Sequence, residues 1–276
     1  CLVGSEMCIR DRNYPIENNQ DNVNKRIEEA PVTAEERLEV TFIDVGQADS
    51  ILLENEGHYM LIDAGNNEDG PKLVNYFKNQ NISNFDYVIG THPHEDHIGG
   101  LDDVIENFNI ETFYMPDVIT TTKTFEDVLD ALGEKNMSLS IPKTNATFKL
   151  GDATVKVLYV GTEEESDLNN TSIVLKVTYQ NISFLFTGDA STKVEEQLNK
   201  SDLQSTVLKV GHHGSSTATN EEFLNTVNPQ YAVISVGVDN QYGHPHTTVL
   251  NTLASHNITT SVSYTHLRAH ETLSDL

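Results

Sequence analysis

The stretch THPHEDHIGG, residues 91–100, decides the fold, because it places three imidazoles and Asp96 directly after an apolar run. That run, residues 85–90, is short and rich in aromatic and β-branched side chains, which predicts a strand. Residues two apart in extended backbone point the same way, so His92 and His94 can converge on one point. Asp96 and His97 follow where an amphipathic helix begins, and they can reach a second point nearby. We therefore expect two metal ions, about 3.5–4 Å apart, with a water bridging them.

The alternative is that these histidines form a solvated turn on the surface. One or two histidines in a turn would favour that alternative. Three of them at this spacing, after a strand and before Gly99 and Gly100, favour a metal site instead. The reason is that a cluster of imidazoles without an ion would repel itself once protonated.

The motif resembles the metal-binding signature of the metallo-β-lactamase superfamily. Further stretches match the same family: FIDVGQADS at 42–50, LIDAG at 61–65, FTGD at 186–189, KVGHHGS at 209–215 and YGHPH at 242–246. The set is most similar to the hydrolase domain at the C-terminus of ComEC-type competence proteins and to its free-standing relatives. The resemblance covers residues 38–260 and is specific in combination.

This resemblance implies an α/β fold, a four-layer αββα sandwich in which two mixed sheets carry the site at their shared edge. The apolar pattern adds strand-like runs and helical stripes, such as those at 71–80 and 124–135. The last clear strand in the sequence is 231–236, and a helix follows at 247–256. We expect the final strand of the sandwich to be missing, which would truncate the C-terminal edge.

The resemblance also implies ligands for the two ions. His92 and His94 would hold the first ion, and Asp96 and His97 would hold the second. Asp189 would bridge both, because a carboxylate can bind two cations where an amide could not.

One histidine of the pair His212 and His213 would complete the second ion's ligands. We favour His212 and give His213 a supporting or substrate-contacting role, although the sequence leaves this choice open. Asp63 would hold a ligating histidine from behind. Asn170 stands where related lactamases have a third histidine, and it is either a weak ligand or a loop cap. A weak ligand there would let the first site accept Mn²⁺ as well as Zn²⁺.

His244 and His246 flank a proline in a loop near the C-terminus. Both could contact a phosphate or protonate a leaving oxygen. We assign catalytic roles to His244 and to Asp96, and a supporting or substrate role to His246.

Composition limits the kinds of partner. The chain has 276 residues, no apolar run long enough to span a bilayer and a formal net charge of −25. Such a surface argues against nucleic-acid binding through a basic face. It does not exclude a nuclease, because bound divalent ions reverse the local field.

The two ends resemble translations of opposite strands of one transposase sequencing adapter. We interpret residues 1–12 and 261–276 as adapter-derived and exclude them from fold reasoning. Residues 13–37 are rich in Asn, Asp and Glu and predict a flexible polar linker before the hydrolase domain at 38–260. Because such an arm often follows a signal or membrane anchor, we favour an exported or membrane-anchored location at the bacterial surface over a cytoplasmic one.

The predicted function is a dinuclear, metal-dependent hydrolase that uses two divalent ions, Zn²⁺ or Mn²⁺, to activate a bridging hydroxide. A phosphodiesterase or nuclease is our first choice, with a phosphoester substrate such as DNA. One alternative is a lactam or thioester hydrolase, and another is a metal-binding module without catalysis. Nothing in the sequence indicates an oligomeric state.

Overall fold

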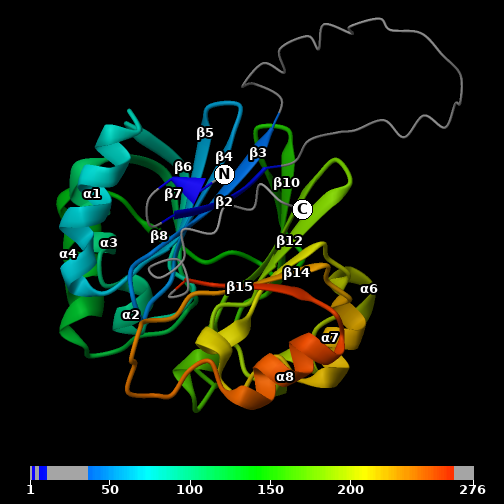
Figure 1. The fold of residues 1–276 in the computed structure, drawn as a ribbon. Coiled ribbons are helices and arrows are strands. Elements are labelled where there is room, and N and C mark those ends of the chain that lie inside the picture. Colours follow the sequence, from blue (N-terminus) through cyan, green and yellow to red (C-terminus); the bar gives the residue numbers. More distant parts are fainter. Residues whose placement is uncertain (1, 4–5, 11–36, 264–276) are drawn as a thin grey trace, which may run out of the picture.

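The computed structural model describes residues 2–3, 6–10 and 37–263, in which each half of the chain builds one mixed sheet (Figure 1). Helices α1, α3 and α4 cover the outer face of the first sheet, and α6, α7 and α8 cover that of the second. Within the described residues, no helix has the length and apolar character needed to cross a membrane. The expected α/β fold with two mixed sheets is confirmed.

The first sheet has the strand order β1-β2-β3-β4-β5-β6-β7-β8. Its strands are β1 (Leu2–Val3), β2 (Glu6–Arg10), β3 (Leu38–Ile43), β4 (Ser50–Asn55), β5 (His58–Ala64), β6 (Asn84–Ile89), β7 (Asn109–Tyr114) and β8 (Leu139–Ser140). Its helices are η1 (Asn67–Asp69), α1 (Gly70–Asn79), α2 (Glu95–Ile98), α3 (Leu101–Asn107) and α4 (Lys123–Glu134).

The second sheet has the order β15-β14-β13-β12-β11-β10-β9. Its strands are β9 (Thr147–Leu150), β10 (Ala153–Tyr159), β11 (Val174–Tyr179), β12 (Ile182–Phe186), β13 (Val207–Lys209), β14 (Tyr231–Ile234) and β15 (Thr259–Val262). Its helices are η2 (Leu168–Thr171), α5 (Thr192–Glu195), α6 (Lys200–Leu203), η3 (Gly211–Gly214), α7 (Glu221–Val227) and α8 (Thr247–Ser255).

Both sheets follow one plan, in which antiparallel strands precede parallel ones. Strands β2 to β5 pair antiparallel and β5 to β8 parallel, and β9 to β12 pair antiparallel and β12 to β15 parallel. Tight turns join three of the antiparallel pairs, β4–β5, β9–β10 and β11–β12. In the first of them Glu56 and Gly57 both have positive φ. The parallel pairs need crossovers, and the helices of each half supply them.

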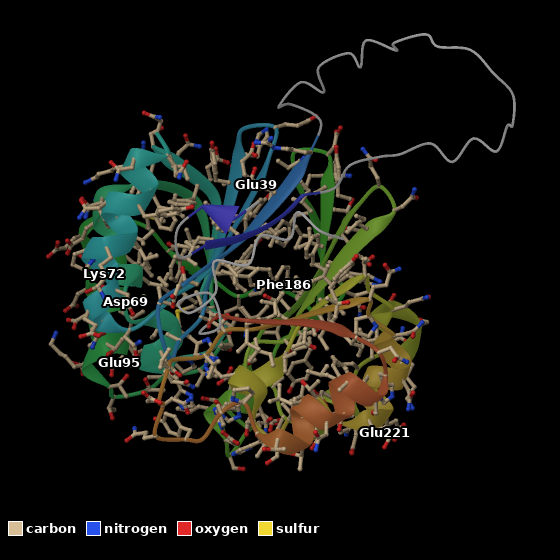
Figure 2. The ribbon with its side chains drawn as sticks, viewed as in Figure 1. Glu39, Asp69, Lys72, Glu95, Phe186 and Glu221 are labelled. Carbon is tan, nitrogen blue, oxygen red and sulfur yellow. The ribbon has the colours of Figure 1, made fainter. Side chains whose placement is uncertain are left out.

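Three buried apolar layers hold the sandwich together, one inside each helix layer and one between the sheets. Figure 2 shows Phe186 between the sheets and Glu221 on the outer side of a helix. Burying a side chain of this size contributes about 1.5–3 kcal/mol. Representative members of the three layers are Phe77, Val104 and Phe125; Val40, Val155 and Phe186; and Val194, Phe223 and Val249.

The candidate site residues follow the C-terminal ends of strands. His92 and His94 come after β6, Asp189 after β12, and His213 after β13. Asp63 is the second-to-last residue of β5 itself. Because the carboxyl ends of parallel strands open at one edge of a sheet, polar side chains from distant parts of the sequence meet there.

One expectation about the C-terminal edge is wrong. The final strand, which we expected to be missing, is present as β15 and pairs parallel with β14. Its residues include two that we interpret as adapter-derived, and strands β1 and β2 lie in the other such stretch. The predicted linker at 13–37 falls outside the described residues except for Arg37.

Gly99 marks a point where two backbones nearly touch. A Cβ at this position would lie 2.2 Å from the carbonyl carbon of Asn66 and from the nitrogen of Asn67. The Gly99 amide also donates to the carbonyl oxygen of Gly65 at 2.8 Å. Since a backbone cannot move aside as a flexible side chain can, Gly99 keeps the histidine turn against the end of β5.

We predict that Gly99→Ala lowers the free energy of unfolding by about 1–3 kcal/mol, because the added carbon overpacks the contact. Urea denaturation followed by circular dichroism would measure it. The control is Gly133→Ala on the exposed side of α4, where no atom lies within 4 Å of the added carbon. That variant should gain up to about 1 kcal/mol from helix propensity. Equal stabilities of the two variants would contradict the close approach at Gly99.

Candidate metal centre

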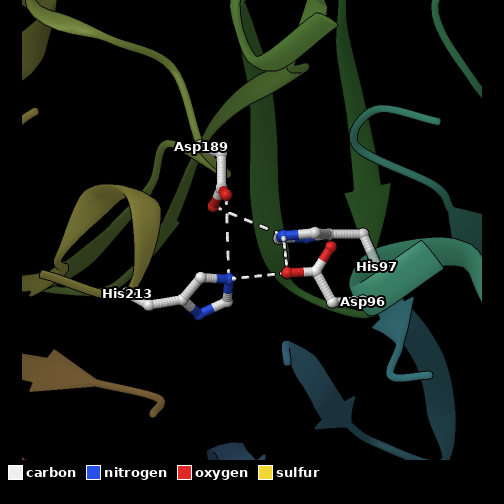
Figure 3. Close-up of side chains that lie close together, drawn as sticks. All are labelled: Asp96, His97, Asp189 and His213. Atoms are coloured by element: carbon white, nitrogen blue, oxygen red, sulfur yellow. Dashed lines mark ion pairs between the residues drawn. The ribbon is translucent and has the colours of Figure 1, made fainter. Parts of the chain in front are cut away.

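Four side chains converge at the shared edge of the sheets: Asp96, His97, Asp189 and His213 (Figure 3). Their candidate ligand atoms all lie within 4.8 Å of one another. Nε2 of His213 lies 3.3 Å from Oδ2 of Asp96, and Nε2 of His97 lies 3.3 Å from Oδ1 of Asp189. Two imidazoles and two carboxylates at this spacing form a ligand set that suits a divalent transition metal.

Three atoms of this group are buried and have no hydrogen-bond partner: Nε2 of His97, Oδ1 of Asp189 and Nε2 of His213. Leaving a buried polar atom unsatisfied costs about 1–3 kcal/mol, so native proteins avoid it. A cation among these atoms would satisfy all three together. The residues present therefore fit a metal ion.

Both imidazoles of the group are held through their other nitrogen. Nδ1 of His97 donates to Oδ2 of Asp63 at 2.8 Å, and Nδ1 of His213 donates to the carbonyl oxygen of Ser235 at 3.0 Å. A neutral imidazole carries one N–H, so these bonds leave a lone pair on each Nε2, facing the centre. Asp63 thus lies behind a candidate ligand, where the sequence placed it.

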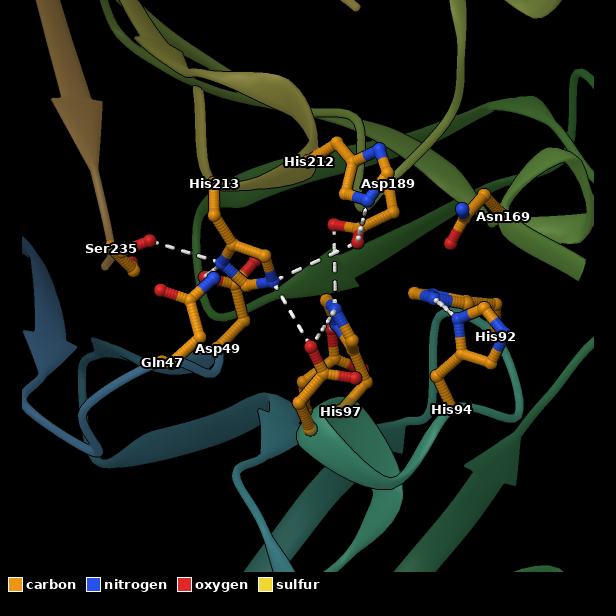
Figure 4. A network of polar contacts seen from close by, with 12 residues as sticks. Gln47, Asp49, His92, His94, His97, Asn169, Asp189, His212, His213 and Ser235 are labelled. Carbon is orange, nitrogen blue, oxygen red and sulfur yellow. Dashed lines mark hydrogen bonds and ion pairs between the residues drawn. The ribbon is translucent and has the colours of Figure 1, made fainter. Parts of the chain in front are cut away.

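His92 and His94 form a second group beside the first (Figure 4). Nε2 of His92 lies 3.0 Å from Nδ1 of His94, and the rings of His92 and His97 are 4.1 Å apart. The Thr91 hydroxyl donates to Asp63 at 2.8 Å and can accept from Nδ1 of His92 at 3.1 Å. That arrangement directs a lone pair of His92 towards His94, as binding of a shared cation requires.

The asparagine beside this group is Asn169, which the sequence analysis did not select. Its amide oxygen is buried without a hydrogen-bond partner. Figure 4 shows the Asn169 side chain near His92 and His94. The oxygen of Asn170 instead accepts hydrogen bonds from the amide and the hydroxyl of Ser191, at 3.2 and 2.6 Å. These contacts favour the loop-cap role of Asn170 over the weak-ligand role, a choice that the sequence left open. The two neighbours diverge because residues of the short helix η2 point in different directions.

His213, rather than His212, belongs to the buried group. Nε2 of His212 lies 3.6 Å from Asp189, but its side chain is 24% exposed and its Nδ1 lies 3.0 Å from the Thr217 hydroxyl. Both histidines have left-handed backbone, with φ of 50° and 51°. Such a conformation costs about 1–3 kcal/mol for a residue with a side chain, and the directions of side chains there follow neither the helix nor the strand period. Our preference for His212 as the ligand is revised accordingly.

Residues 43–238 match a family model described as the metallo-beta-lactamase superfamily. The chain belongs to the metallo-β-lactamase superfamily. The matched range contains both groups of candidate ligands and leaves out His244 and His246.

The chain is also similar to part of two larger proteins. It is 30% identical over 240 residues to ComE operon protein 3 of Bacillus subtilis, and 29% identical over 230 residues to competence protein ComA of Neisseria gonorrhoeae. These matches cover 80% and 81% of the chain but only 31% and 30% of the relatives. The chain therefore spans less than a third of either relative, and the resemblance to ComEC-type competence proteins is confirmed for this portion.

A solved structure supports the superfamily fold. The metallo-beta-lactamase fold protein YhfI from Bacillus subtilis superposes with a TM-score of 0.55 at 13% identity. The match covers 82% of this chain and 95% of YhfI. At this identity the similarity concerns the fold.

The imidazoles of His212, His244 and His246 lie beside the candidate metal centre and belong to neither group of ligands. We call these three side chains the imidazole rim. The ring of His244 lies 5.6 Å from that of His212 and 4.9 Å from that of His246. Nδ1 of His246 accepts a hydrogen bond from the Ser216 amide at 2.9 Å, so its Nε2 carries the proton. Burial and the two neighbouring imidazoles lower the pKa of His244 to about 4. His244 is therefore neutral at pH 7, and it suits hydrogen bonding to a substrate better than proton donation from an imidazolium.

The buried carboxylates control the charge of the centre. Burial alone would lower the pKa of His97, but Asp189 and Asp63 raise it well above its usual value. Burial alone would raise the pKa of Asp189, and the charges of His97 and His213 hold it well below the usual range. Without an ion, a proton on His97 offsets the carboxylates. A cation has to replace that proton, so binding should release it.

Glu195 supports the loop behind His212. Its Oε1 accepts a hydrogen bond from the Thr219 amide at 2.6 Å, and the same loop carries Thr217, which contacts His212. Glu195 is only 4% exposed, and burial raises its pKa to about 7. Its carboxyl group is therefore protonated in the folded chain at pH values where it would be ionised in the unfolded chain.

We predict that Glu195 makes the folded chain less stable as the pH rises from 5 to 8. Over this range the unfolded chain is ionised at Glu195 while the folded chain gives up its proton only near pH 7. The free energy of unfolding should therefore fall by about 2–3 kcal/mol relative to Glu195→Gln, which cannot ionise. Urea denaturation of both proteins at several pH values would measure the difference. A difference independent of pH would contradict the raised pKa.

Proposed function

We propose that the chain is a dinuclear metal-dependent phosphodiesterase, and that DNA is its substrate. The observation that carries this proposal is the pair of adjoining groups, His92 with His94 and Asp96 with His97 and His213. Asp189 adjoins both, because it lies against His97 and His213. Burial and the charge of His97 lower the pKa of His92 well below its usual value, and the charge of Asp189 partly opposes them. This arrangement suits two divalent ions better than one.

The two ions, Zn²⁺ or Mn²⁺, would acidify a water held between them and offset the negative charge that develops on a phosphoester. The residues of the chain prepare this site. Asp63 and Ser235 hold His97 and His213 with their Nε2 atoms turned inward. Asp96, whose side chain is 31% exposed, is the most exposed of the four converging side chains and would be the one best placed to meet substrate.

The imidazole rim favours an anionic substrate. His246 presents a fixed N–H donor at Nε2, and the neutral His244 and His212 rings adjoin it. Neutral donors can bind a phosphate without the like-charge repulsion that three imidazolium groups would suffer. In a chain with a formal net charge of −25, this rim would supply hydrogen-bond donors to the oxygens of a phosphodiester.

We predict that His213→Ala and His212→Ala differ strongly in metal binding and activity. His213→Ala should lose one of two bound ions and at least about a hundredfold in kcat/KM with bis-p-nitrophenyl phosphate, because a buried ligand is removed. His212→Ala should keep both ions and lose about tenfold or less. Elemental analysis and steady-state kinetics with Mn²⁺ or Zn²⁺ would measure both. His58→Ala, which removes a half-exposed surface ring, is the control. The reverse order of His212 and His213 would overturn the ligand assignment.

We predict that the metal-loaded chain cleaves plasmid DNA and bis-p-nitrophenyl phosphate, but not nitrocefin or an acyl thioester. Parallel assays with equal enzyme would compare these substrates, and His94→Ala would report background activity. Hydrolysis of nitrocefin or the thioester alone would favour the lactam or thioester reading. Two tightly bound ions without any turnover would favour a metal-binding module.

A further inference from the structure

Lys209 is a charged residue in an apolar layer. It ends β13, and its side chain points to the same face as that of Val207, because alternate strand residues share a face. Val207 belongs to the core between the sheets, whereas Leu208 packs towards the helices. Lys209 is only 1% exposed. A lysine is almost never buried to this degree unless its charge is paired.

The partner of Lys209 is Asp49, in the turn after β3. The two side chains form a buried ion pair at 2.8 Å, with 1% and 2% exposure, and Nζ also donates to the carbonyl oxygen of Val210 at 3.2 Å. The paired residues are 160 positions apart and belong to different sheets. The pair therefore ties the two halves of the sandwich together beneath the candidate metal centre.

Stability alone is a poor explanation for this pair. Removing two charges from water costs several kcal/mol for each ion, and apolar side chains of similar volume often stabilise a core at least as well. The neighbours of the pair offer a better explanation, because Asp49 touches the residues of the centre on two sides.

Asp49 contacts the elements that carry Asp96 and His213, and Figure 4 shows it beside His213. Its amide donates to the carbonyl oxygen of Asp96 at 3.1 Å. Its Oδ1, which is buried without a hydrogen-bond partner, lies 3.8 Å from Nδ1 of His213. Among the hydrogen bonds and ion pairs described for 37–263, none joins Asp49 to His92 or His94. The contacts of Asp49 therefore concern the group of Asp96 and His213, and not the group of His92 and His94.

We propose that Lys209 and Asp49 are positioning residues for the ion held by Asp96, His97, Asp189 and His213. Lys209 fixes the Asp49 carboxylate, and Asp49 in turn holds the turn of Asp96 and the ring of His213 at their mutual distance. This inference rests on the proposed dinuclear centre. It adds that the ion pair of Lys209 and Asp49 links the two halves of the sandwich next to the second ion.

A role through charge and a role through positioning predict opposite results for Lys209→Met. If the pair acted only through its charge, Lys209→Met would make the centre more negative and tighten cation binding, whereas Asp49→Asn would weaken it. If the pair positions the ligands, either substitution releases Asp49 and weakens binding. The double variant removes both buried charges together, so it avoids an unpaired buried ion and is the variant most certain to fold.

The experiment measures Zn²⁺ binding to the wild-type chain, Lys209→Met, Asp49→Asn and the double variant by competition with a chromophoric chelator. We expect the dissociation constant of one ion to rise about 10–100-fold in all three variants, and that of the other ion to stay near its wild-type value. The matched control is Lys156→Met, which breaks a partly exposed ion pair with Asp202 at 2.9 Å away from the centre. It should bind both ions as the wild type does.

Three results would overturn this inference. Tighter Zn²⁺ binding by Lys209→Met, or wild-type affinity in the double variant, would assign the pair a role through charge alone. A lower melting temperature with both ions bound normally would reduce the pair to a structural tie. A wild-type chain that binds no Zn²⁺ would overturn the proposed function as well, which distinguishes the two failures.

Discussion

The structure depends on hydrogen-bond and ion-pair partners for the carboxylates and imidazoles that are buried at the edge of an apolar sandwich. Asp63 does much of this alone. Its carboxylate accepts from the amide and hydroxyl of Thr91 at 2.7 and 2.8 Å and from His97 at 2.8 Å. Asp63 itself has a φ of 59°, an unfavourable value that persists only where the surroundings demand it. One residue thus connects the end of β5 to both groups of candidate ligands.

The three apolar layers of the sandwich stabilise the fold and so offset the destabilising effect of such a centre. Buried atoms without hydrogen-bond partners, such as Nε2 of His97 and of His213, each cost stability. Two left-handed histidines add strain at the same place. Ion binding would relieve the unsatisfied atoms, so fold and centre are coupled through the strand ends.

Much of this architecture could be predicted from local patterns. The strand before His92, the helices near 71–80 and 124–135 and the hairpin of β9 and β10 all follow from apolar periodicity and turn residues. The four-layer arrangement came from the resemblance, since periodicity does not say how two sheets stack. The final strand β15 was missed because two of its four residues lie in the stretch that we excluded from fold reasoning, and because the four carry little apolar signal. Its pairing with β14 stabilises it.

The sequence by itself determined which kinds of residue build the centre, because their spacing after strands is a local property. The tertiary structure placed Asn169 rather than Asn170 beside His92 and His94, and His213 rather than His212 in the buried group. In each pair the neighbours differ by one position in an irregular segment, where side-chain direction depends on backbone angles that no sequence period sets. Only the folded chain also brought Lys209 to Asp49, because a contact across two sheets is created by packing rather than by sequence proximity.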